Sequence, residues 1–248
     1  MKHLLNSIVL IFLFSNLKSQ TAPYSQILLN VFKITTDTGS GTCFAAKYND
    51  RVYFFTAGHL FKSAVKSGDV VPVTINSKNV DRKLAAKIFF HQNRNIDIAL
   101  IEIKENIHSD YLTDIRIENH LGQSVLFFGF PLSWKAGTPT PYGYMPIVKG
   151  GIISGFINYK GSDLMALDGN NIPGFSGGPV LCKGKSDKDP YVCGIISGYF
   201  PEINETLVYD STSQNYKKTS SILSMENSGV CFSIESKYMV ELINSINK

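Results

Sequence analysis

The sequence predicts an all-β fold of two antiparallel β-barrels followed by a C-terminal α-helix. Short runs of β-branched and aromatic residues alternate with turns that contain Gly, Asn, Asp and Pro. This pattern is typical of antiparallel barrels or sandwiches and not of alternating α/β units. The polar segment 108–122 divides about twelve such runs into two sets of about six. We therefore interpret it as a linker between two barrels of similar size.

Local patterns indicate the individual elements. Apolar residues recur near helical spacing in residues 235–246, which predicts an amphipathic helix at the end of the chain. Two long segments, 132–146 and 201–229, are expected to be excursions between strands, and loops of this size are often functional. The expected strands are residues 27–33, 41–48, 52–56, 70–75, 83–91, 98–103, 124–130, 150–157, 163–168, 179–181, 191–199 and 229–234.

We expect residues 1–19 to be a secretory signal peptide. Lys2 and His3 precede the apolar run 8–14, and a polar segment follows it. The apolar run is shorter than the roughly 20 residues that span a bilayer. We therefore expect an exported protein, secreted or periplasmic, that has no membrane contact once the signal peptide is removed. The expected mature parts are a barrel at 20–112, a linker at 113–123, a barrel at 124–234 and a helix at 235–248.

Composition and charge exclude several classes of partner. The chain has 248 residues, of which 44% are hydrophobic and 18% charged, so it is globular rather than disordered. Loss of two lysines with the signal peptide lowers the net charge from +4 to +2. That charge is too small to indicate binding to nucleic acid or to an anionic membrane.

The four cysteines permit disulfides in an exported protein. Cys182 and Cys193 flank the turn-rich segment 183–190, so we expect them to be bonded across a hairpin. Cys43 and Cys231 are far apart in the sequence and could be buried thiols or a second bridge. Because no Cys-x-x-Cys or Cys/His cluster has the spacing of a zinc site, we expect no metal, and the sequence indicates no cofactor.

The segment Pro173-Gly174-Phe175-Ser176-Gly177-Gly178-Pro179 has the composition of a turn that displays its serine. Its glycines and prolines impose backbone positions that ordinary residues resist. Glycine-rich backbone beside an exposed hydroxyl can aim N–H groups at one point, as the stabilisation of an oxyanion in acyl transfer requires. Plain tight turns also contain Gly-Gly-Pro, so the segment alone does not separate the two interpretations.

A serine nucleophile requires a base, and the base requires a partner that fixes its tautomer. His59 ends the apolar run 53–57 next to two small residues, where a histidine can be held on a rigid edge. Asp97 stands at the mouth of the apolar run 98–101, where a carboxylate is costly unless an imidazole N–H pairs with it. The alternative for Asp97 is a simple turn cap. The remaining histidines lie in the signal peptide, at strand ends or in the linker.

Three motifs together resemble the signatures of trypsin-like serine proteases. They are Thr56-Ala57-Gly58-His59, Asp97-Ile98-Ala99-Leu100 and Gly174-Phe175-Ser176-Gly177-Gly178-Pro179, in the order of that family. Residues 39–44 resemble the glycine-rich strand before the histidine in bacterial high-temperature-requirement and glutamyl-type proteases. The resemblance implies two six-stranded barrels with the site in the cleft between them, and a member without a PDZ domain.

The resemblance also implies a role for each motif residue. Ser176 would be the nucleophile, His59 the general base and acid, and Asp97 the orienting carboxylate. The N–H groups of Gly174 and Ser176 would form the oxyanion hole. The segment Ser197-Gly198-Tyr199 resembles the strand that pairs with the backbone of a protein or peptide substrate and walls its primary pocket.

Three positions differ from the pattern of trypsin-like serine proteases, and each bears on activation or on substrate preference. The residue before the serine is often an aspartate that binds a newly cut N-terminus, but here it is Phe175, so we expect activity without that zymogen switch. Asn170, which stands where the floor of the primary pocket often lies, carries no charge, and this argues against Lys/Arg preference. Ile196 replaces the histidine of acid-cleaving relatives, so we expect an uncharged, small or medium residue before the cut.

The leading interpretation is a secreted serine endopeptidase. A non-catalytic trypsin-like binding module is the alternative, although such modules usually lack one of the three site residues and none is missing here. An esterase would share the acyl-enzyme chemistry, but an α/β-hydrolase orders its residues serine, acid, histidine.

Overall fold

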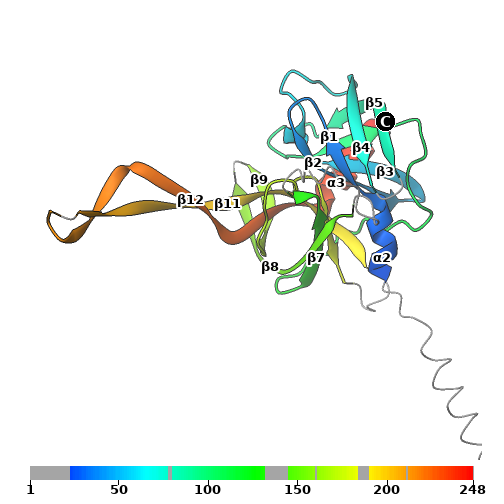
Figure 1. Cartoon of the computed structure of the whole chain (residues 1–248). Helices are drawn as coiled ribbons and strands as arrows, with labels where there is room; N and C mark the ends of the chain where they lie inside the picture. The colour runs from blue at the N-terminus through cyan, green and yellow to red at the C-terminus, as the bar shows by residue number, and fades with distance from the viewer. Residues whose placement is uncertain are drawn as a thin grey trace, which may run out of the picture.

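The computed structural model describes residues 23–77, 80–131, 145–159, 161–183, 190–210 and 212–247. It confirms two closed six-stranded antiparallel barrels and a C-terminal helix (Figure 1). The expected signal peptide and most of the segment 132–146 lie outside these residues.

The first barrel closes in the order β1-β2-β3-β6-β5-β4. Its strands match the expected runs closely, except that β1 begins at Val31 because α2 (Pro23–Ile27) and the 3-10 helix η1 (Leu28–Asn30) precede it. In β5, residues from Leu84 to Phe90 alternate between exposed and buried, as expected for a strand with one face in a core. The strands are β1 (Val31–Thr35), β2 (Ser40–Tyr48), β3 (Arg51–Thr56), β4 (Val70–Asn76), β5 (Asp81–Phe90) and β6 (Ala99–Glu102).

The second barrel closes in the order β10-β11-β12-β9-β8-β7. Its core includes Phe127, Ile153 and Phe175, which are fully buried. The strands are β7 (Ser124–Gly129), β8 (Ile147–Tyr159), β9 (Ser162–Asp168), β10 (Pro179–Cys182), β11 (Tyr191–Asp210) and β12 (Asn215–Glu235).

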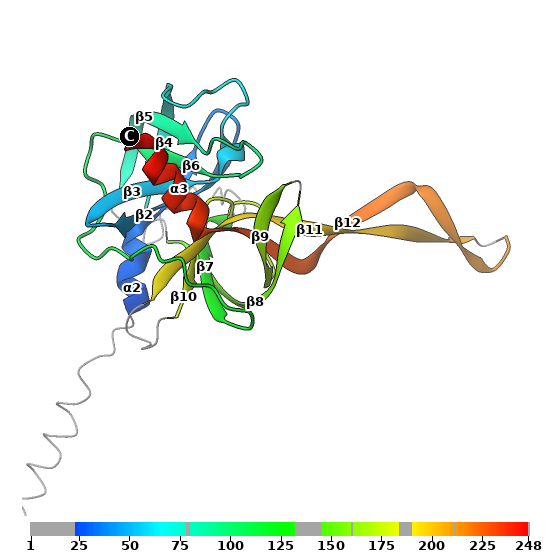
Figure 2. The same cartoon turned by 180° about the vertical axis from the view of Figure 1, so that it is seen from behind.

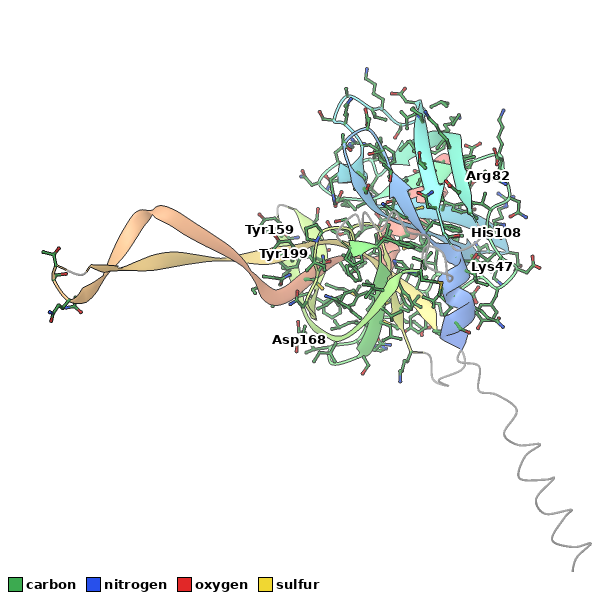
Figure 3. The ribbon with its side chains drawn as sticks, viewed as in Figure 1. Lys47, Arg82, His108, Tyr159, Asp168 and Tyr199 are labelled. Atoms are coloured by element: carbon green, nitrogen blue, oxygen red, sulfur yellow. The ribbon has the colours of Figure 1, made fainter. Side chains whose placement is uncertain are left out.

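The largest difference from the sequence prediction lies in residues 201–229. These residues were expected to form a polar excursion, but β11 and β12 continue through them as a hairpin that projects far from the barrel (Figures 1 and 2). The prediction was wrong because polar composition was taken as the mark of a loop, whereas a ribbon with both faces outside a core needs no apolar face. We call residues 201–227 the arm; Tyr199, labelled in Figure 3, lies at its root.

The helix α3 (Ser236–Ile246) joins the two barrels (Figure 2). It follows β12 of the second barrel directly and buries Tyr238, Met239 and Leu242 in the core between the barrels. The carboxylate of Glu241 lies 3.0 Å from Nε2 of His91, which follows β5 of the first barrel. The ring of His91 also meets the ring of Tyr238 edge-on, with centroids 5.7 Å apart.

The predicted disulfide between Cys182 and Cys193 is absent: both residues are buried free thiols. They do lie on a hairpin, but the ladder pairs Cys182 with Tyr191, and a register shift follows Val180. The Cys193 thiol donates a hydrogen bond to the carbonyl of Val180 (3.4 Å). Cys43 and Cys231 are buried free thiols as well, and burial raises the pKa of Cys231 to about 12.

Candidate active site

The pairing of β3 with β6 brings His59 and Asp97 together. Thr56 and Ala99 are register partners at the ends of these strands. Asp97 precedes Ala99 by two residues, and His59 follows Thr56 on the short 3-10 helix η2 (Gly58–Leu60). Strand register, rather than proximity in the sequence, therefore determines this contact.

Both carboxylate oxygens of Asp97 bind His59. The distance from Nδ1 of His59 to Oδ2 of Asp97 is 2.7 Å, and the backbone N–H of His59 donates to Oδ1, also at 2.7 Å. At Gly58, a Cβ atom would lie 3.3 Å from Oδ1, so a small residue keeps the approach open. The imidazole is thereby fixed with Nδ1 toward the carboxylate and Nε2 away from it.

The environment raises the pKa of His59 and lowers the pKa of Asp97, so both shifts favour the charged forms. The hydrogen bond to Asp97 raises the pKa of His59 above its ordinary value, although burial opposes it and the negative charge of Asp97 adds to it. Burial works to raise the pKa of Asp97, but the hydrogen bonds from His59 and Ser197 outweigh it and the pKa lies below the ordinary value. Asp97 is therefore an ionised acceptor at neutral pH.

Ser197 of β11 connects this pair to the second barrel. Its hydroxyl donates to Oδ2 of Asp97 at 2.6 Å, and its carbonyl accepts a hydrogen bond from the hydroxyl of Ser176 at 3.3 Å. Among the described hydrogen bonds, none joins Oγ of Ser176 to Nε2 of His59. The three residues singled out by sequence thus meet around Ser197, which was expected only as part of a substrate-pairing strand.

The residues before Ser176 form a tight turn. The N–H of Phe175 donates to the carbonyl of Ile172 at 3.2 Å, with Pro173 and Gly174 in the middle. Gly174 has φ +105°, as the third position of a type II turn requires, and its Cβ would lie 2.2 Å from the carbonyl oxygen of Phe130. Within the described part of the chain, the N–H groups of Gly174 and Ser176 donate to no backbone carbonyl. Two donors are therefore left for a ligand beside the Ser176 hydroxyl.

Thr42 of the first barrel holds this turn from outside. Its hydroxyl donates to the carbonyl of Gly174 at 2.7 Å and accepts from the N–H of Phe130 at 3.1 Å. Its backbone N–H donates to the carbonyl of Ser176 at 2.8 Å. Thr42 is fully buried. The sequence prediction missed it, although it lies in the glycine-rich run 39–44 that had been singled out.

Phe175 occupies the core of the second barrel. It is fully buried, and its ring meets that of Phe127 edge-on, with centroids 5.5 Å apart. The glycine at 129 makes room for it, because a Cβ there would lie 2.6 Å from the Phe175 ring. An apolar contact thus fixes the turn in the core of the second barrel.

Of the residues expected to bind substrate, Asn170 is exposed and its carbonyl accepts a hydrogen bond from Nζ of Lys149 at 2.7 Å. Its neighbour Asn171 is 2% exposed. The side-chain amide of Asn171 donates to the backbone carbonyl of Gly198 at 3.1 Å. The backbone carbonyl of Asn171 accepts a hydrogen bond from the side-chain amide of Asn227. Asn171, which the sequence prediction missed, therefore links the turn segment to both strands at the root of the arm.

Among the described residues, no group of three or more His, Cys, Asp or Glu side chains is placed to hold a metal ion. The helices in that part of the chain include none with the length and apolar character to cross a bilayer.

Comparison with solved structures identifies the fold class as that of the trypsin-like serine proteases. The Rv3671c protease of M. tuberculosis in an inactive form matches with 14% identity and a TM-score of 0.57, over 92% of this chain and 93% of that one. A serine endoprotease from Yersinia pestis matches with 17% identity and a TM-score of 0.59, over 92% and 66%. The HtrA-type protease AlgW with a tripeptide matches with 20% identity and a TM-score of 0.57, over 92% and 63%. At these identities the likeness shows the fold, and this chain spans about two thirds of the last two proteins.

A sequence-family model gives the assignment. The model described as trypsin-like peptidase domain matches residues 39–186, which is more than half of the chain. A search of curated proteins gave no significant match. The chain therefore belongs to the trypsin-like peptidase family and is a serine peptidase. The matched region contains His59, Asp97 and Ser176, and it ends before β11.

Proposed function

We propose that this protein is a secreted or periplasmic serine endopeptidase that cleaves peptide bonds through Ser176, His59 and Asp97. The observation that carries the proposal is the set of three hydrogen bonds on the Asp97 carboxylate, two from His59 and one from Ser197. They hold an imidazole in one tautomer next to a serine on a glycine-rich turn. This is the arrangement that general-base activation of a serine requires.

The first step is attack by Ser176 on the substrate carbonyl carbon. With Nδ1–H of His59 bonded to Asp97, Nε2 is the basic nitrogen and takes the hydroxyl proton as the Oγ–C bond forms. The hydroxyl must turn from the carbonyl of Ser197, its partner in the free protein, toward Nε2. Such contacts commonly tighten when substrate binds.

The negative charge formed on the substrate oxygen is received by the N–H groups of Gly174 and Ser176. Loss of one such donor typically costs on the order of 2.7–4 kcal/mol of transition-state stabilisation. His59 then passes its proton to the leaving amine, and the C–N bond breaks to give an acyl-enzyme. Water, deprotonated by the same nitrogen, hydrolyses the ester and restores Ser176.

We further propose that the enzyme needs no newly cut N-terminus for activity. A phenyl ring cannot bind an ammonium group in an ion pair, and Phe175 is fully buried against Phe127. The turn is instead held by this apolar contact and by Thr42. Samples with an extended N-terminus should therefore turn over peptides as fast as trimmed samples. Strict dependence on a trimmed Ile or Val terminus would contradict the proposal.

The decisive experiment for the activity is labelling with a fluorophosphonate. We expect the native protein to be labelled at Ser176 and the Ser176→Ala variant to remain unlabelled, with circular dichroism showing that both are folded. Folded native protein that resists labelling would instead support the non-catalytic binding module. Hydrolysis of a protein substrate against a small ester would separate a peptidase from an esterase.

A further inference from the structure

The arm begins where the active site ends. Ser197, whose carbonyl accepts the hydrogen bond from Ser176, lies on β11 four residues before Pro201, the first residue of the arm. From Pro201↔Asn227 to Asp210↔Asn215, β11 and β12 pair along the arm, with one register shift between Glu205 and Thr206 that leaves residues 220–222 of β12 without a register partner. At about 3.3 Å per residue, residues 201–210 extend about 30 Å beyond the barrel. This projection is plain in both views of the fold (Figures 1 and 2).

One edge of β11 becomes free at the active site. On that edge β10 pairs with β11 only as far as Ile195, and the last contacts are Gly177 N–H to Ile196 O (2.7 Å) and Ile196 N–H to Gly178 O (2.9 Å). Beyond Ile196, β11 has only β12 as a strand partner within the described residues. The free edge therefore starts beside Ser176 and continues along the arm.

The root of the arm is tied to the site. Asn171 donates to the carbonyl of Gly198 on the outgoing strand and accepts from the side chain of Asn227 on the returning strand. Asn227 also accepts from the N–H of Gly229 at 3.0 Å. These bonds fix the direction in which the free edge leaves the Ser176 turn.

We propose that the free edge of β11 along the arm binds the substrate chain on the amino-terminal side of the scissile bond, as an added antiparallel strand. This inference rests on the proposed function and on the expectation that residues 197–199 pair with the substrate backbone beside its primary pocket. Residues farther upstream then lie farther along β11. An unpaired strand edge is a template for another extended chain, and main-chain hydrogen bonds give such pairing its affinity. The arm itself gains a third strand, which a two-stranded ribbon in water lacks.

The substrate class follows from this geometry. A chain that pairs along the arm must be extended for about ten residues or more upstream of the cut, so long unfolded segments are preferred over short peptides and compact surfaces. Because main-chain groups make the contacts, the preference depends on length more than on upstream sequence. Acidic and basic residues both occur in the arm, so its charge selects no single class of substrate.

Two variants isolate the arm. In the short-arm variant Asn-Gly replaces residues 203–225; it joins Glu202 and Glu226, which are register partners, through a two-residue hairpin turn. In the matched tip variant Asn-Gly replaces residues 211–214, between the paired Asp210 and Asn215, and the arm keeps its edge. Both variants retain Asn171, Ser197 and Asn227.

The test compares quenched fluorescent peptides with the same cleaved bond and upstream segments of about four and about fourteen residues. We expect kcat/KM to be about tenfold or more higher for the long peptide with the native protein and the tip variant, as several net hydrogen bonds provide. With the short-arm variant the two peptides should differ by less than about twofold. Extension on the carboxyl-terminal side, or N-methylation of successive upstream residues, should give no gain with any protein.

Each result decides between the alternatives. Equal kcat/KM for short and long peptides with the native protein would overturn the inference while leaving the proposed function intact. The inference would also fail if the short-arm variant kept the higher kcat/KM for the long peptide. It would fail as well if removal of the arm changed only the molecular mass in solution, since the arm would then join two copies of the chain. If no peptide is cleaved, the proposed function fails, and fluorescence anisotropy of the long peptide with native and short-arm proteins tests the arm separately.

Discussion

The two barrels contribute to the site in different ways. The first barrel assembles the base and its carboxylate within itself, because the ends of β3 and β6 are neighbours in one sheet. The second barrel supplies Ser176 on a turn that is not fixed by its own barrel alone. That turn also depends on Thr42, which reaches it from the first barrel. The proposed base is therefore oriented within one barrel, with one added hydrogen bond from Ser197 of the other barrel to Asp97. The turn of the proposed nucleophile depends on the contact between the two barrels.

A second contrast lies in what each barrel presents to a substrate. Within the described residues, the strands of the first barrel close on themselves and leave no long free edge. In the second barrel, β11 and β12 continue beyond the closed sheet as the arm. The family match contains His59, Asp97 and Ser176 and ends before the arm, so the proposed recognition of the upstream substrate chain uses residues outside the matched region.

The largest expected effect tests the pair inside the first barrel. Asp97→Asn should lower kcat on the order of 10⁴-fold, because the amide favours the wrong imidazole tautomer and withdraws the charge that stabilises the imidazolium. Peptide hydrolysis with active-site titration measures it. Glu241→Gln, a matched change in the carboxylate that binds His91, should leave kcat unchanged. A loss below about tenfold for Asp97→Asn would contradict the assigned role.

The next effect tests the turn of the second barrel. Gly174→Ala places a Cβ 2.2 Å from the carbonyl oxygen of Phe130 at φ +105°, so the turn must reorganise and the Gly174 N–H must move. We expect kcat to fall about 10²–10³-fold, as for loss of an oxyanion donor. Gly39→Ala is the control, since nothing lies within 4 Å of a Cβ there. Similar kcat values for the two variants would exclude Gly174 from the oxyanion hole.

A smaller effect tests the contact between the barrels. Thr42→Val removes a buried hydroxyl that bonds the carbonyl of Gly174 and the N–H of Phe130. These two groups keep their mutual hydrogen bond at 3.4 Å, so we expect a total loss of about 1–3 kcal/mol in the free energy of unfolding. Because the turn moves, kcat should fall more than KM rises. Thr74→Val, at a half-buried position of β4 whose hydroxyl makes no hydrogen bond described in the structure, should change stability by less than about 0.5 kcal/mol. A stable Thr42→Val variant with native kcat would show that each barrel fixes its own residues.

The smallest expected effect is on the pH dependence of kcat/KM, which follows the protonation of His59. Neutral His59 is the active form, so kcat/KM should rise with pH through its raised pKa, and this limb should lie above the ordinary value of 6.5. The sign for stability is opposite. The charged form is favoured in the folded state, so its stabilisation is present below pH 6.5 and is lost as pH rises through the raised pKa. Comparison of native protein with His59→Ala in urea unfolding across this range measures it, and an activity limb below 6.5 would contradict the assignment.

The sequence predicted most of the residues that the structure brings together at the candidate site, because they lie in short local motifs. The apolar runs before His59 and after Asp97 identified strand ends, and the glycines around Ser176 identified a strained turn. Thr42 and Asn171 were missed because their roles arise from contacts between distant segments, which no local pattern records. The domain limits and the signal peptide remain predictions.

The arm was missed for a different physical reason. Sequence patterns identify strands by an apolar face, and this face exists only where a sheet covers a core. A ribbon that leaves the barrel has no core on either side, so its sequence shows no apolar face. The polar residues 201–229 were therefore interpreted as a loop. The disulfide expected between Cys182 and Cys193 was wrong because pairing across a hairpin depends on register, and the ladder places Cys182 opposite Tyr191.

The helix α3 gives the two-barrel arrangement a second tether. The chain first passes from one barrel to the other through residues 103–123, and it returns through α3, where Tyr238 and Glu241 contact His91. The polypeptide thus connects the two barrels at two places. A single proteolytic cut in the first crossing would leave the halves of the site held together by the second, so Ser176 and His59 would stay within reach of each other in a nicked chain.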